Sequence, residues 1–485
     1  MRLCKKVCNP LFAPWNRALF CTSTAANHSK IPLKAEFVTP TSASIGQIRN
    51  QFASWIAIGS YKPGLLSHLS TPDIMRALFV LRTCSYDFVV SRSIQLFNIS
   101  TKFGPLGEWG LRKTFFNQFV GGDTLPGMKL TVESMQRRGL VLMVAPVLEE
   151  DIEDEQSSQK TYDDNLQSLL NLANMTSALE KKKPIIQLKP TAIMPAITLE
   201  KVSKAMTQYL EDKKVTHATL ISQLANCIEH PKNLELKLSN EDKSQFLDGL
   251  QRADVFVKHC RDLKVHVLVD AEFYSCKPAI SAIALILMAR HNGDYHHVGN
   301  TIQAYLKDAV QTIESELKTV TEDIGVNWYG KIVRGAYMDR ERYLADKNGY
   351  ISPVCDTYEA TNISYNKAVK TVLKNLSQNP KKKSHLLVAS HNEVSIRLAA
   401  QAMKDYEISA NDDRVSFAQI YGMADYLSTP LVSKNYHVYK STPYGPIVKV
   451  LPYLARRASE NRSVMMGARE ERDMLWKELK MRFKM

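Results

Sequence analysis

The chain has 485 residues, of which 45% are hydrophobic and 23% are charged. This composition is typical of a globular protein, and the length accommodates one barrel domain of roughly 250–300 residues with additions, or two or three smaller domains. The formal net charge is +14, but residues 1–35 hold six basic residues and no acidic one, so the remainder carries 14 − 6 = +8. Zinc-finger spacings, aromatic RNA-binding runs and basic helices flanked by heptads are absent from the sequence, which argues against nucleic-acid binding.

The composition of residues 1–35, rich in arginine, lysine, serine and threonine, predicts a mitochondrial transit peptide. A disordered basic tail is the alternative. The eight cysteines are scattered without a Cys-x-x-Cys pair, which predicts a reduced compartment and no structural zinc site. The longest apolar run, residues 279–289, is too short to span a bilayer.

Two segments that flank the centre of the chain have helical patterns. Apolar residues between 44 and 137 recur at spacings of three and four, and Thr71 or Asp73 is the expected N-cap of one helix. We interpret residues 36–137 as an N-terminal helical arm that wraps the main domain. Residues 469–485 predict a basic amphipathic helix, which would rest on a membrane surface or pack on the main domain.

Between these segments, eight short β-favouring runs alternate with helix-like segments. Apolar strands separated by helices predict a parallel sheet, and eight such units predict an α/β fold of the (β/α)8 TIM-barrel type. The Gly-rich fingerprints of dinucleotide-binding and P-loop folds are absent from the sequence. We assign the barrel to residues 138–468, with a helical insertion at 197–262 and an acidic loop at 149–156. The predicted strands are 140–144, 185–188, 265–269, 298–302, 331–333, 385–388, 415–420 and 436–439.

Polar residues stand where nearly every predicted strand ends, and in a barrel of this type the chemistry takes place at the C-terminal strand ends. No histidine, aspartate and glutamate cluster has metal-ligand spacing, so we expect no metal site. Lys189 is compatible with a Schiff-base aldolase. The many neutral hydrogen-bonding groups and cations instead favour a flavin, a large cofactor with phosphates and a heteroaromatic ring. The strand-end residues are Lys189, Asp270, Gln303, Arg334, His391, Gln419 and Ser441.

The segment after the last predicted strand carries turn signals at 443–446 and then a helical pattern. On that helix Tyr453, Arg456, Arg457 and Glu460 share one face, because their spacings are three and four residues. Adjacent guanidinium groups beside a phenol indicate a receptor for a carboxylate. A solvated, salt-bridged helix face is the alternative.

Six segments together resemble the proline dehydrogenase family, in the same order and across residues 110–468. The resemblance implies a distorted (β/α)8 barrel that binds FAD non-covalently and oxidises a cyclic imino acid. It also implies ubiquinone as the electron acceptor and peripheral association with the mitochondrial inner membrane on its matrix side. The segments are KIVRGAYMDRER, LVDAEFYSCKPAI, TIQAYLKDA, LVASHNE, FAQIYGMAD and YLARRASENRS.

The same resemblance implies roles for residues on the C-terminal helix and the strand ends. Arg456 and Arg457 would pair with the substrate carboxylate, with Lys189 as a third cation. Tyr453 would pack on the substrate ring, and Glu460 would hold an arginine in place. Other matched positions would supply an apolar contact (Ile420), the floor of the pocket (Asp270 and Tyr337) and the FAD-binding groups (Gln303, Lys331, Arg334, Gly335, His391 and Gln419).

Ser441 is the most informative departure from the family pattern. Proline-preferring members have a tyrosine twelve residues before the position of Tyr453, whereas this chain has a serine, as hydroxyproline-preferring members do. A serine leaves space near ring C4 and offers a hydroxyl partner, and a buried hydroxyl without a partner costs ~1–3 kcal/mol. We therefore expect trans-4-hydroxy-L-proline as the substrate and L-proline as a weaker one. An L-proline dehydrogenase, a Schiff-base aldolase and a basic binding protein are the alternatives.

Overall fold

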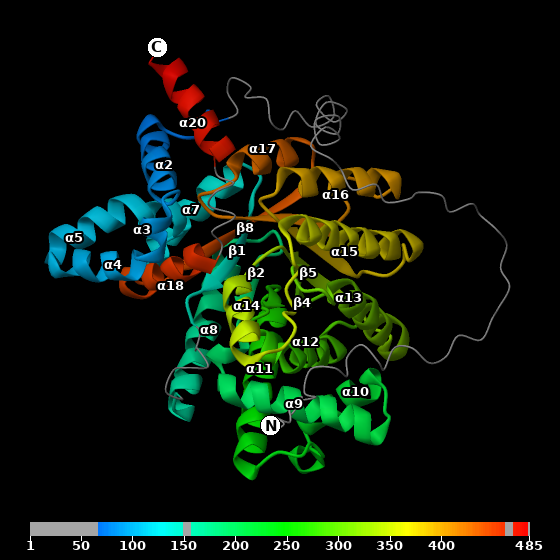
Figure 1. The fold of residues 1–485 in the computed structure, drawn as a ribbon. Coiled ribbons are helices and arrows are strands. Elements are labelled where there is room, and N and C mark those ends of the chain that lie inside the picture. Colours follow the sequence, from blue (N-terminus) through cyan, green and yellow to red (C-terminus); the bar gives the residue numbers. More distant parts are fainter. Residues whose placement is uncertain (1–65, 149–156, 461–468, 484–485) are drawn as a thin grey trace, which may run out of the picture.

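The computed structural model describes residues 66–148, 157–460 and 469–483. Its centre is a closed barrel of eight parallel strands in chain order, in which β8 pairs with β1. Figure 1 shows this barrel surrounded by helices. The predicted (β/α)8 architecture is therefore confirmed. The strands are β1 (Val141–Pro146), β2 (Ile185–Leu188), β3 (His266–Val269), β4 (Val298–Gln303), β5 (Tyr329–Val333), β6 (His385–Ala389), β7 (Val415–Ile420) and β8 (His437–Tyr444).

The last strand differs from its prediction, because β8 continues to Tyr444 instead of ending at Tyr439. Pro443, which was read as part of a turn, lies inside the strand, and its carbonyl accepts a hydrogen bond of 2.9 Å from the Gly121 amide. The chain turns at Gly445, whose φ of +147° favours glycine. As a result, Ser441 lies within the barrel wall and not beyond it.

Most of the described helices lie on the outside of the barrel and cover its strands (Figure 1). Three helices between β2 and β3 form the insertion: α9 (Ala196–Lys213), α10 (His217–Cys227) and α11 (Asn240–Asp262). Since both faces of each strand are covered, the strands are buried almost throughout. The other covering helices are α8 (Gln159–Leu179), α12 (Lys277–His291), α13 (Ala309–Leu317), α14 (Met338–Asn348), α15 (Tyr358–Gln378), α16 (Glu393–Asp405) and α17 (Asp425–Ser433), whereas α18 (Ile447–Glu460), after β8, packs on the N-terminal arm.

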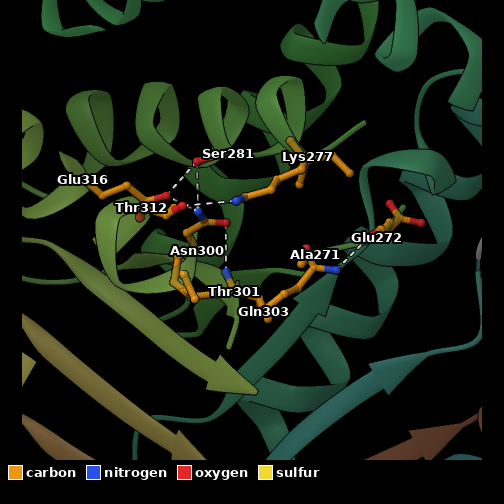
Figure 2. A pocket seen from close by; sticks show the side chains of 12 residues that line it. Ala271, Glu272, Lys277, Ser281, Asn300, Thr301, Gln303, Thr312 and Glu316 are labelled. Atoms are coloured by element: carbon orange, nitrogen blue, oxygen red, sulfur yellow. Dashed lines mark hydrogen bonds between the residues drawn. The ribbon is translucent and has the colours of Figure 1, made fainter. Parts of the chain in front are cut away.

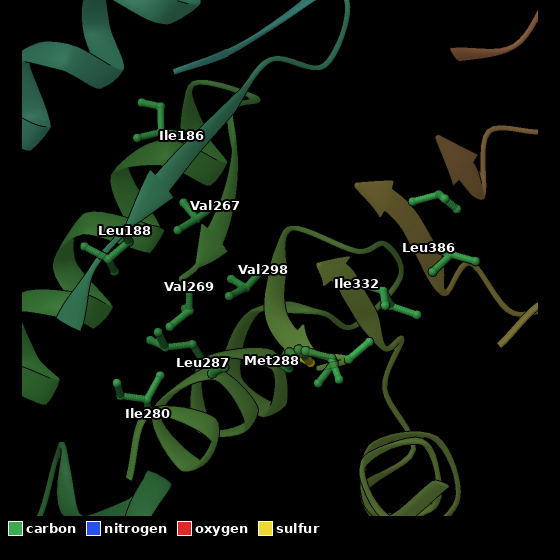
Figure 3. Close-up of a cluster of buried hydrophobic side chains, with 14 of the residues drawn as sticks. Ile186, Leu188, Val267, Val269, Ile280, Leu287, Met288, Val298, Ile332 and Leu386 are labelled. Atoms are coloured by element: carbon green, nitrogen blue, oxygen red, sulfur yellow. The ribbon is translucent and has the colours of Figure 1, made fainter. Parts of the chain in front are cut away.

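The main core lies between the strands and these helices. Figure 3 shows Ile186 and Val267 of neighbouring strands in the same cluster as Ile280, Leu287 and Met288 of α12. These side chains are almost completely buried. A second, smaller cluster fills the inside of the barrel and consists of Val141, Met143, Ile185, Leu268, Tyr329, Leu387, Ala418 and Tyr439.

Side chains alternate between the two faces of each strand, so residues two positions beyond the inner cluster also point into the barrel. Following Ile185, Leu268, Tyr329 and Tyr439, these residues are Gln187, Asp270, Lys331 and Ser441. The inside of the barrel therefore changes from apolar to polar toward the C-terminal strand ends.

A cluster of neutral rings in mutual contact occupies the N-terminal end of the barrel. The His296 ring centroid lies 4.1 Å from that of Tyr295, 4.5 Å from His385 and 5.3 Å from His266. Nδ1 of His385 donates to the carbonyl of Asp413 at 2.9 Å. Burial lowers the pKa of both His266 and His385 to about 3, so these rings are uncharged at neutral pH.

The described part of the N-terminal segment is helical and packs on α18. Phe116 and Val120 of this arm join Ile447, Val450 and Leu451 in one buried cluster. Figure 1 shows α3, α4 and α5 extending away from the barrel, with α18 beside them. The arm elements are α2 (Thr71–Thr83), α3 (Asp87–Ser91), α4 (Ser93–Lys102), α5 (Gly104–Leu111), the π-helical turn η2 (Arg112–Phe116), α6 (Asn117–Phe119) and α7 (Leu125–Arg137). The N-cap of α2 is Ser70 and not the expected Thr71 or Asp73; Asp73 instead completes a capping box with Ser70 three residues later.

The C-terminal helix α20 (Arg469–Arg482) packs on α2. Its Met474 and Leu475 are buried, and Arg482 Nη1 donates to the carbonyl of Leu69 at 2.8 Å. From the sequence alone, this helix is expected either to rest on a membrane surface or to pack on the protein. In the described structure it packs on α2. Within the described ranges, no helix is both long and apolar enough to cross a membrane.

Candidate active site

A hydrogen-bonded network forms the polar layer at the C-terminal mouth of the barrel. Asp270 lies directly after β3, and its Oδ1 is 2.5 Å from Nζ of Lys331 on β5. Gln187 Nε2 on β2 donates to the two Asp270 oxygens at 3.2 and 3.1 Å. On β8, Ser441 Oγ donates to Oε1 of Gln187 at 2.8 Å. These contacts pass over the intervening strands β1 and β4, so the network spans the inside of the barrel.

The charges in this network compensate each other. The Lys331 side chain is only 5% exposed and that of Asp270 is 15% exposed. Such a buried lysine is tolerated because the carboxylate stands beside it, and removing one partner leaves an uncompensated buried charge. Thr301 Oγ1 of β4 adds a longer contact of 3.5 Å to Asp270 Oδ1. The floor of the mouth is therefore polar and preorganised by its own hydrogen bonds.

The rim of the mouth brings the end of β2 to helix α18. The Nζ atom of buried Lys189 lies 4.6 Å from the centroid of the Tyr453 ring, which is a cation–π distance. One turn further along α18, the Arg456 side chain is exposed. The side chains of Arg457 and Glu460 lie outside the described part of the structure, although their backbone belongs to α18.

Gln303 ends β4, where its Nε2 donates to the Glu272 carbonyl and the Tyr305 hydroxyl, both at 2.8 Å. The Glu272 carboxylate accepts from the amide and the hydroxyl of Thr191 at 3.1 and 2.6 Å. Glu272 therefore connects the ends of β2 and β4. The side chain of Gln303 is held by neighbours and does not contact the Asp270 network directly.

A small cavity lies behind β4, on the side of α12 and α13. Its volume is about 20 Å³, enough for one water molecule. Figure 2 shows Asn300 and Glu316 facing each other there, joined by a hydrogen bond of 2.7 Å. Apart from Gln303, none of the predicted site residues lines this cavity. We therefore regard it as part of the support for β4 and place the candidate site at the barrel mouth.

Arg334 follows β5 and stands among residues of α15 and α16. Its Nη1 donates to Ser395 Oγ at 2.8 Å, and its Nη2 donates to Asn362 Oδ1. The guanidinium carbon is 5.2 Å from the Tyr365 ring centroid and 5.7 Å from that of Tyr358. Burial lowers the Arg334 pKa from its usual high value.

Gly335 and Tyr337 follow Arg334 in the loop to α14. Tyr337 is buried, adopts a left-handed φ of +49° and packs edge-on against Phe273, with ring centroids 5.0 Å apart. Non-glycine residues in this conformation are uncommon and need support from their surroundings. The Phe273 contact supplies that support and positions Tyr337 beside the β3 side of the mouth.

His391 and Gln419 occupy the β6–β7 side of the mouth. His391 Nε2 accepts a hydrogen bond of 2.9 Å from the backbone amide of Ile420. Burial, with the nearby Lys440 charge, lowers the His391 pKa to about 3. The ring is therefore neutral, and because Nε2 accepts, its hydrogen is on Nδ1. Gln419 is oriented by Ser428, whose hydroxyl donates to Oε1 at 2.9 Å.

The predicted residues thus fall into local groups around one mouth. Asp270, Lys331 and Ser441 share a network, Lys189 meets Tyr453, and His391 meets Ile420. Several polar residues were missed because they lie within strands, on helices or a few residues beyond a strand end. Gln187 is the one that the sequence signals best, as the only polar residue in the apolar run IIQL. The missed residues are Gln187, Thr191, Glu272, Thr301, Asn362 and Ser395.

An α/β barrel with paired charges and hydrogen-bonding side chains at its C-terminal mouth has the form of a barrel enzyme. Solved structures with a similar fold include proline utilization A from Bdellovibrio bacteriovorus, with a TM-score of 0.61 and 17% identity over 90% of this chain and 43% of that chain. At that identity the likeness concerns the fold.

The family model for proline dehydrogenase matches residues 128–469. Hydroxyproline dehydrogenase of Xenopus laevis is 35% identical over 421 residues, which cover 86% of this chain and 89% of that protein. Human hydroxyproline dehydrogenase is 33% identical and covers 87% of this chain and 92% of its own length. Human mitochondrial proline dehydrogenase 1 is 41% identical over 243 residues, 50% of this chain and 40% of that protein. The chain therefore belongs to the proline dehydrogenase family and is an oxidoreductase of proline or hydroxyproline metabolism.

Proposed function

We propose that the protein oxidises trans-4-hydroxy-L-proline, and L-proline more weakly, with FAD as its cofactor and ubiquinone as the electron acceptor. The observation that carries the hydroxylated substrate is Ser441. This small, partly buried hydroxyl stands in the floor of the mouth and hydrogen-bonds to Gln187 at 2.8 Å. A hydroxyl on the substrate ring would find both space and a polar partner there. An L-proline dehydrogenase is the alternative.

The donor set around the mouth suits FAD. A flavin ring and its ribityl chain need neutral hydrogen-bonding groups, and the pyrophosphate needs cations. Neutral His391, with hydrogen on Nδ1, and the oriented amides of Gln303 and Gln419 supply the first kind. Arg334 and Lys331 supply the second, and Gly335 leaves room for close approach to its backbone. When bound, FAD would supply the acceptor for a hydride from the substrate.

The substrate would lie between α18 and the polar floor. Arg456, Arg457 and Lys189 would bind its carboxylate, and Glu460 would orient one of the arginines. Tyr453, which already stacks under Lys189 at 4.6 Å, would cover the ring.

Opposite α18, Ile420 would provide an apolar contact, while Asp270 and Tyr337 would shape the floor. Fixing the ring in one orientation supplies the positional part of catalysis. The ring would give up a hydride from C5 and a proton from its nitrogen, the proton going to solvent, and the product would be Δ1-pyrroline-5-carboxylate or its 3-hydroxy analogue.

Substrate preference and cofactor are tested together with purified protein. We expect a yellow protein with an FAD spectrum that either imino acid bleaches anaerobically, and a higher kcat/KM for hydroxyproline than for proline. In the Ser441→Tyr variant the phenol fills the space near C4, so the preference should move toward proline by tenfold or more, about 1.4 kcal/mol. Ser441→Ala is the matched small variant. A colourless protein that cannot take up FAD contradicts the proposal, as does Ser441→Tyr without a gain for proline.

Lys189 provides a test between the proposal and a barrel aldolase. A Schiff-base lysine would be trapped covalently by borohydride in the presence of a carbonyl substrate. We expect no trapping, because Lys189 would bind the substrate carboxylate as a cation beside Tyr453. A borohydride-stable adduct on Lys189 would favour the aldolase.

We propose further that the protein acts in the mitochondrion, at the matrix side of the inner membrane, and touches the membrane through the arm. Phe103, Leu106 and Trp109 of the α4–α5 region are 68%, 72% and 59% exposed. The basic residues Lys102, at the end of α4, and Arg92, between α3 and α4, are also exposed and would favour an anionic lipid surface. The α20 helix is a weaker candidate, because its Met474 and Leu475 pack on the protein.

Co-sedimentation with cardiolipin-containing vesicles tests this placement. Leu106→Glu with Trp109→Glu should abolish binding, because charged side chains resist insertion, whereas Trp476→Glu on α20 should retain it. Loss of vesicle binding only in the α20 variant would show that the C-terminal helix, and not the arm, contacts the membrane. Wild-type protein that stays in the supernatant would contradict membrane association.

A further inference from the structure

We propose that Gln187 is a specificity-determining positioning residue: it commits the Ser441 hydroxyl to act as a hydrogen-bond acceptor, so that the site recognises a ligand hydroxyl as a donor. The inference rests on the proposed function, because it concerns the ring that this mouth would bind. It adds a residue and a direction of hydrogen bonding to the role proposed for Ser441.

The first step is the direction of the bond between Ser441 and Gln187. Ser441 Oγ lies 2.8 Å from Oε1 of Gln187, a carbonyl oxygen that can only accept. The single hydroxyl hydrogen of Ser441 is therefore used in this bond. What remains on Oγ is acceptor capacity, so Ser441 presents lone pairs to a ligand and no hydrogen.

The second step is that the orientation of the Gln187 amide is determined by a charge. Its Nε2 lies 3.1 and 3.2 Å from the two oxygens of Asp270, and a carboxylate accepts only. The opposite amide orientation would place Oε1 against that carboxylate and lose both bonds. Asp270 is in turn held by Lys331 at 2.5 Å. The charge pair therefore determines which way the Ser441 hydrogen points.

The third step concerns the ligand. A 4-hydroxyl group can donate to Ser441 Oγ, whereas the C4 methylene of proline cannot. One hydrogen bond of ordinary strength corresponds to a kcat/KM about tenfold higher for hydroxyproline than for proline. A 4-substituent that only accepts, such as fluorine, would gain nothing from Ser441. The inferred site therefore distinguishes a hydroxyl donor from a group of merely suitable size.

The variant test compares Gln187→Met with Thr301→Val in the FAD-loaded enzyme. Both changes remove a contact to Asp270, but only Gln187 also contacts Ser441. For Gln187→Met we expect the ratio of kcat/KM for hydroxyproline to that for proline to fall about tenfold. For Thr301→Val we expect both substrates to change by the same factor. Combining Gln187→Met with Ser441→Ala should lower the ratio no further than Ser441→Ala alone.

A ligand test needs no variant, and so it remains decisive if Gln187→Met does not fold. Wild-type enzyme should treat trans-4-fluoro-L-proline like L-proline, within about threefold in kcat/KM, and should prefer the hydroxyl compound to both. A fluoro compound used as well as hydroxyproline overturns the inference, as does a Gln187→Met ratio within twofold of the wild type. In either case oxidation of hydroxyproline leaves the proposed function intact. Wild-type protein that oxidises neither imino acid overturns both.

Discussion

The two ends of the barrel are both lined by buried polar side chains, but these side chains are uncharged at one end and form a charge pair at the other. At the N-terminal end, the rings of His266, His296 and His385 pack against one another at tilted angles, and burial lowers their pKa values so that they stay neutral. At the C-terminal mouth, Lys331 and Asp270 are placed 2.5 Å apart and compensate each other as a pair. Neutral rings can close a barrel without a partner charge, whereas a charge pair keeps an electrostatic field at the end where we propose that the substrate binds.

The difference indicates separate tasks for the two ends. The rings at the N-terminal end make backbone hydrogen bonds, as His385 does with Asp413 at 2.9 Å, and contribute packing. The mouth instead connects β2, β3, β5 and β8 through side chains, which keeps hydrogen-bonding groups in fixed orientations. We therefore expect changes at the mouth to alter activity and stability together, and changes at the other end to alter stability alone.

The largest effect should come from breaking the charge pair. Lys331→Met leaves Asp270 partly buried with no cation, so the free energy of unfolding should fall by about 3–5 kcal/mol. Urea unfolding followed by circular dichroism measures this change. Lys331→Arg is the matched control, because it keeps the charge and should lose much less stability. Equal stability of Lys331→Met and Lys331→Arg would show that the pair does not compensate buried charge.

The second effect is a loss of stability at acidic pH. The pKa values of His266 and His385 are about 3 in the folded protein, below the ordinary histidine value of about 6.5 in an unfolded chain. The unfolded state therefore binds more protons between these values, and stability should fall as the pH drops from about 6.5 toward 3. Each such histidine contributes about 1.4 kcal/mol per pH unit within this window.

The variant His385→Phe tests this dependence, because it removes one proton-binding group while keeping a ring at the position. Urea unfolding at pH 6 and pH 4 should give a slope shallower by about one proton than in the wild type. His391→Phe at the mouth should reduce the acid slope similarly, since the His391 pKa is also about 3, but should in addition weaken FAD binding. An unchanged slope in His385→Phe would mean that the buried histidines are not the source of the acid dependence.

The smallest effect should come from Thr301→Val. Its hydroxyl is 3.5 Å from Asp270 Oδ1, a weak contact beside those of Lys331 and Gln187. We expect a loss of less than about 1 kcal/mol in the free energy of unfolding. Thr301→Ser retains the hydroxyl and serves as the control. A loss as large as that of Lys331→Met would mean that the threonine, and not the lysine, secures the carboxylate.

The sequence alone was sufficient to predict the barrel and to predict that polar residues at its strand ends line one mouth. The β-favouring runs 185–188 and 415–420 coincide with β2 and β7, because a strand covered on both faces is mostly apolar. Polar residues directly after such runs, as with Lys189 and Asp270, must then lie at one end of the barrel. This reasoning is local, and it needs only the period of the strand and the parallel arrangement.

Contacts between distant segments were decided by the tertiary structure. Pro443 belongs to β8 because β1 and the Gly121 amide pair with that stretch, which no local turn signal reveals. Ser441 and Gln187 are 254 residues apart and meet only because the barrel closes with β8 beside β1. The alternation along a strand predicts which face of the sheet a side chain occupies. The closure of the barrel and the register of its strands decide which side chains of different strands meet on that face. For this protein the sequence therefore located the polar strand ends that form the mouth, and the closed barrel decided which of their side chains contact each other, as Ser441 and Gln187 do.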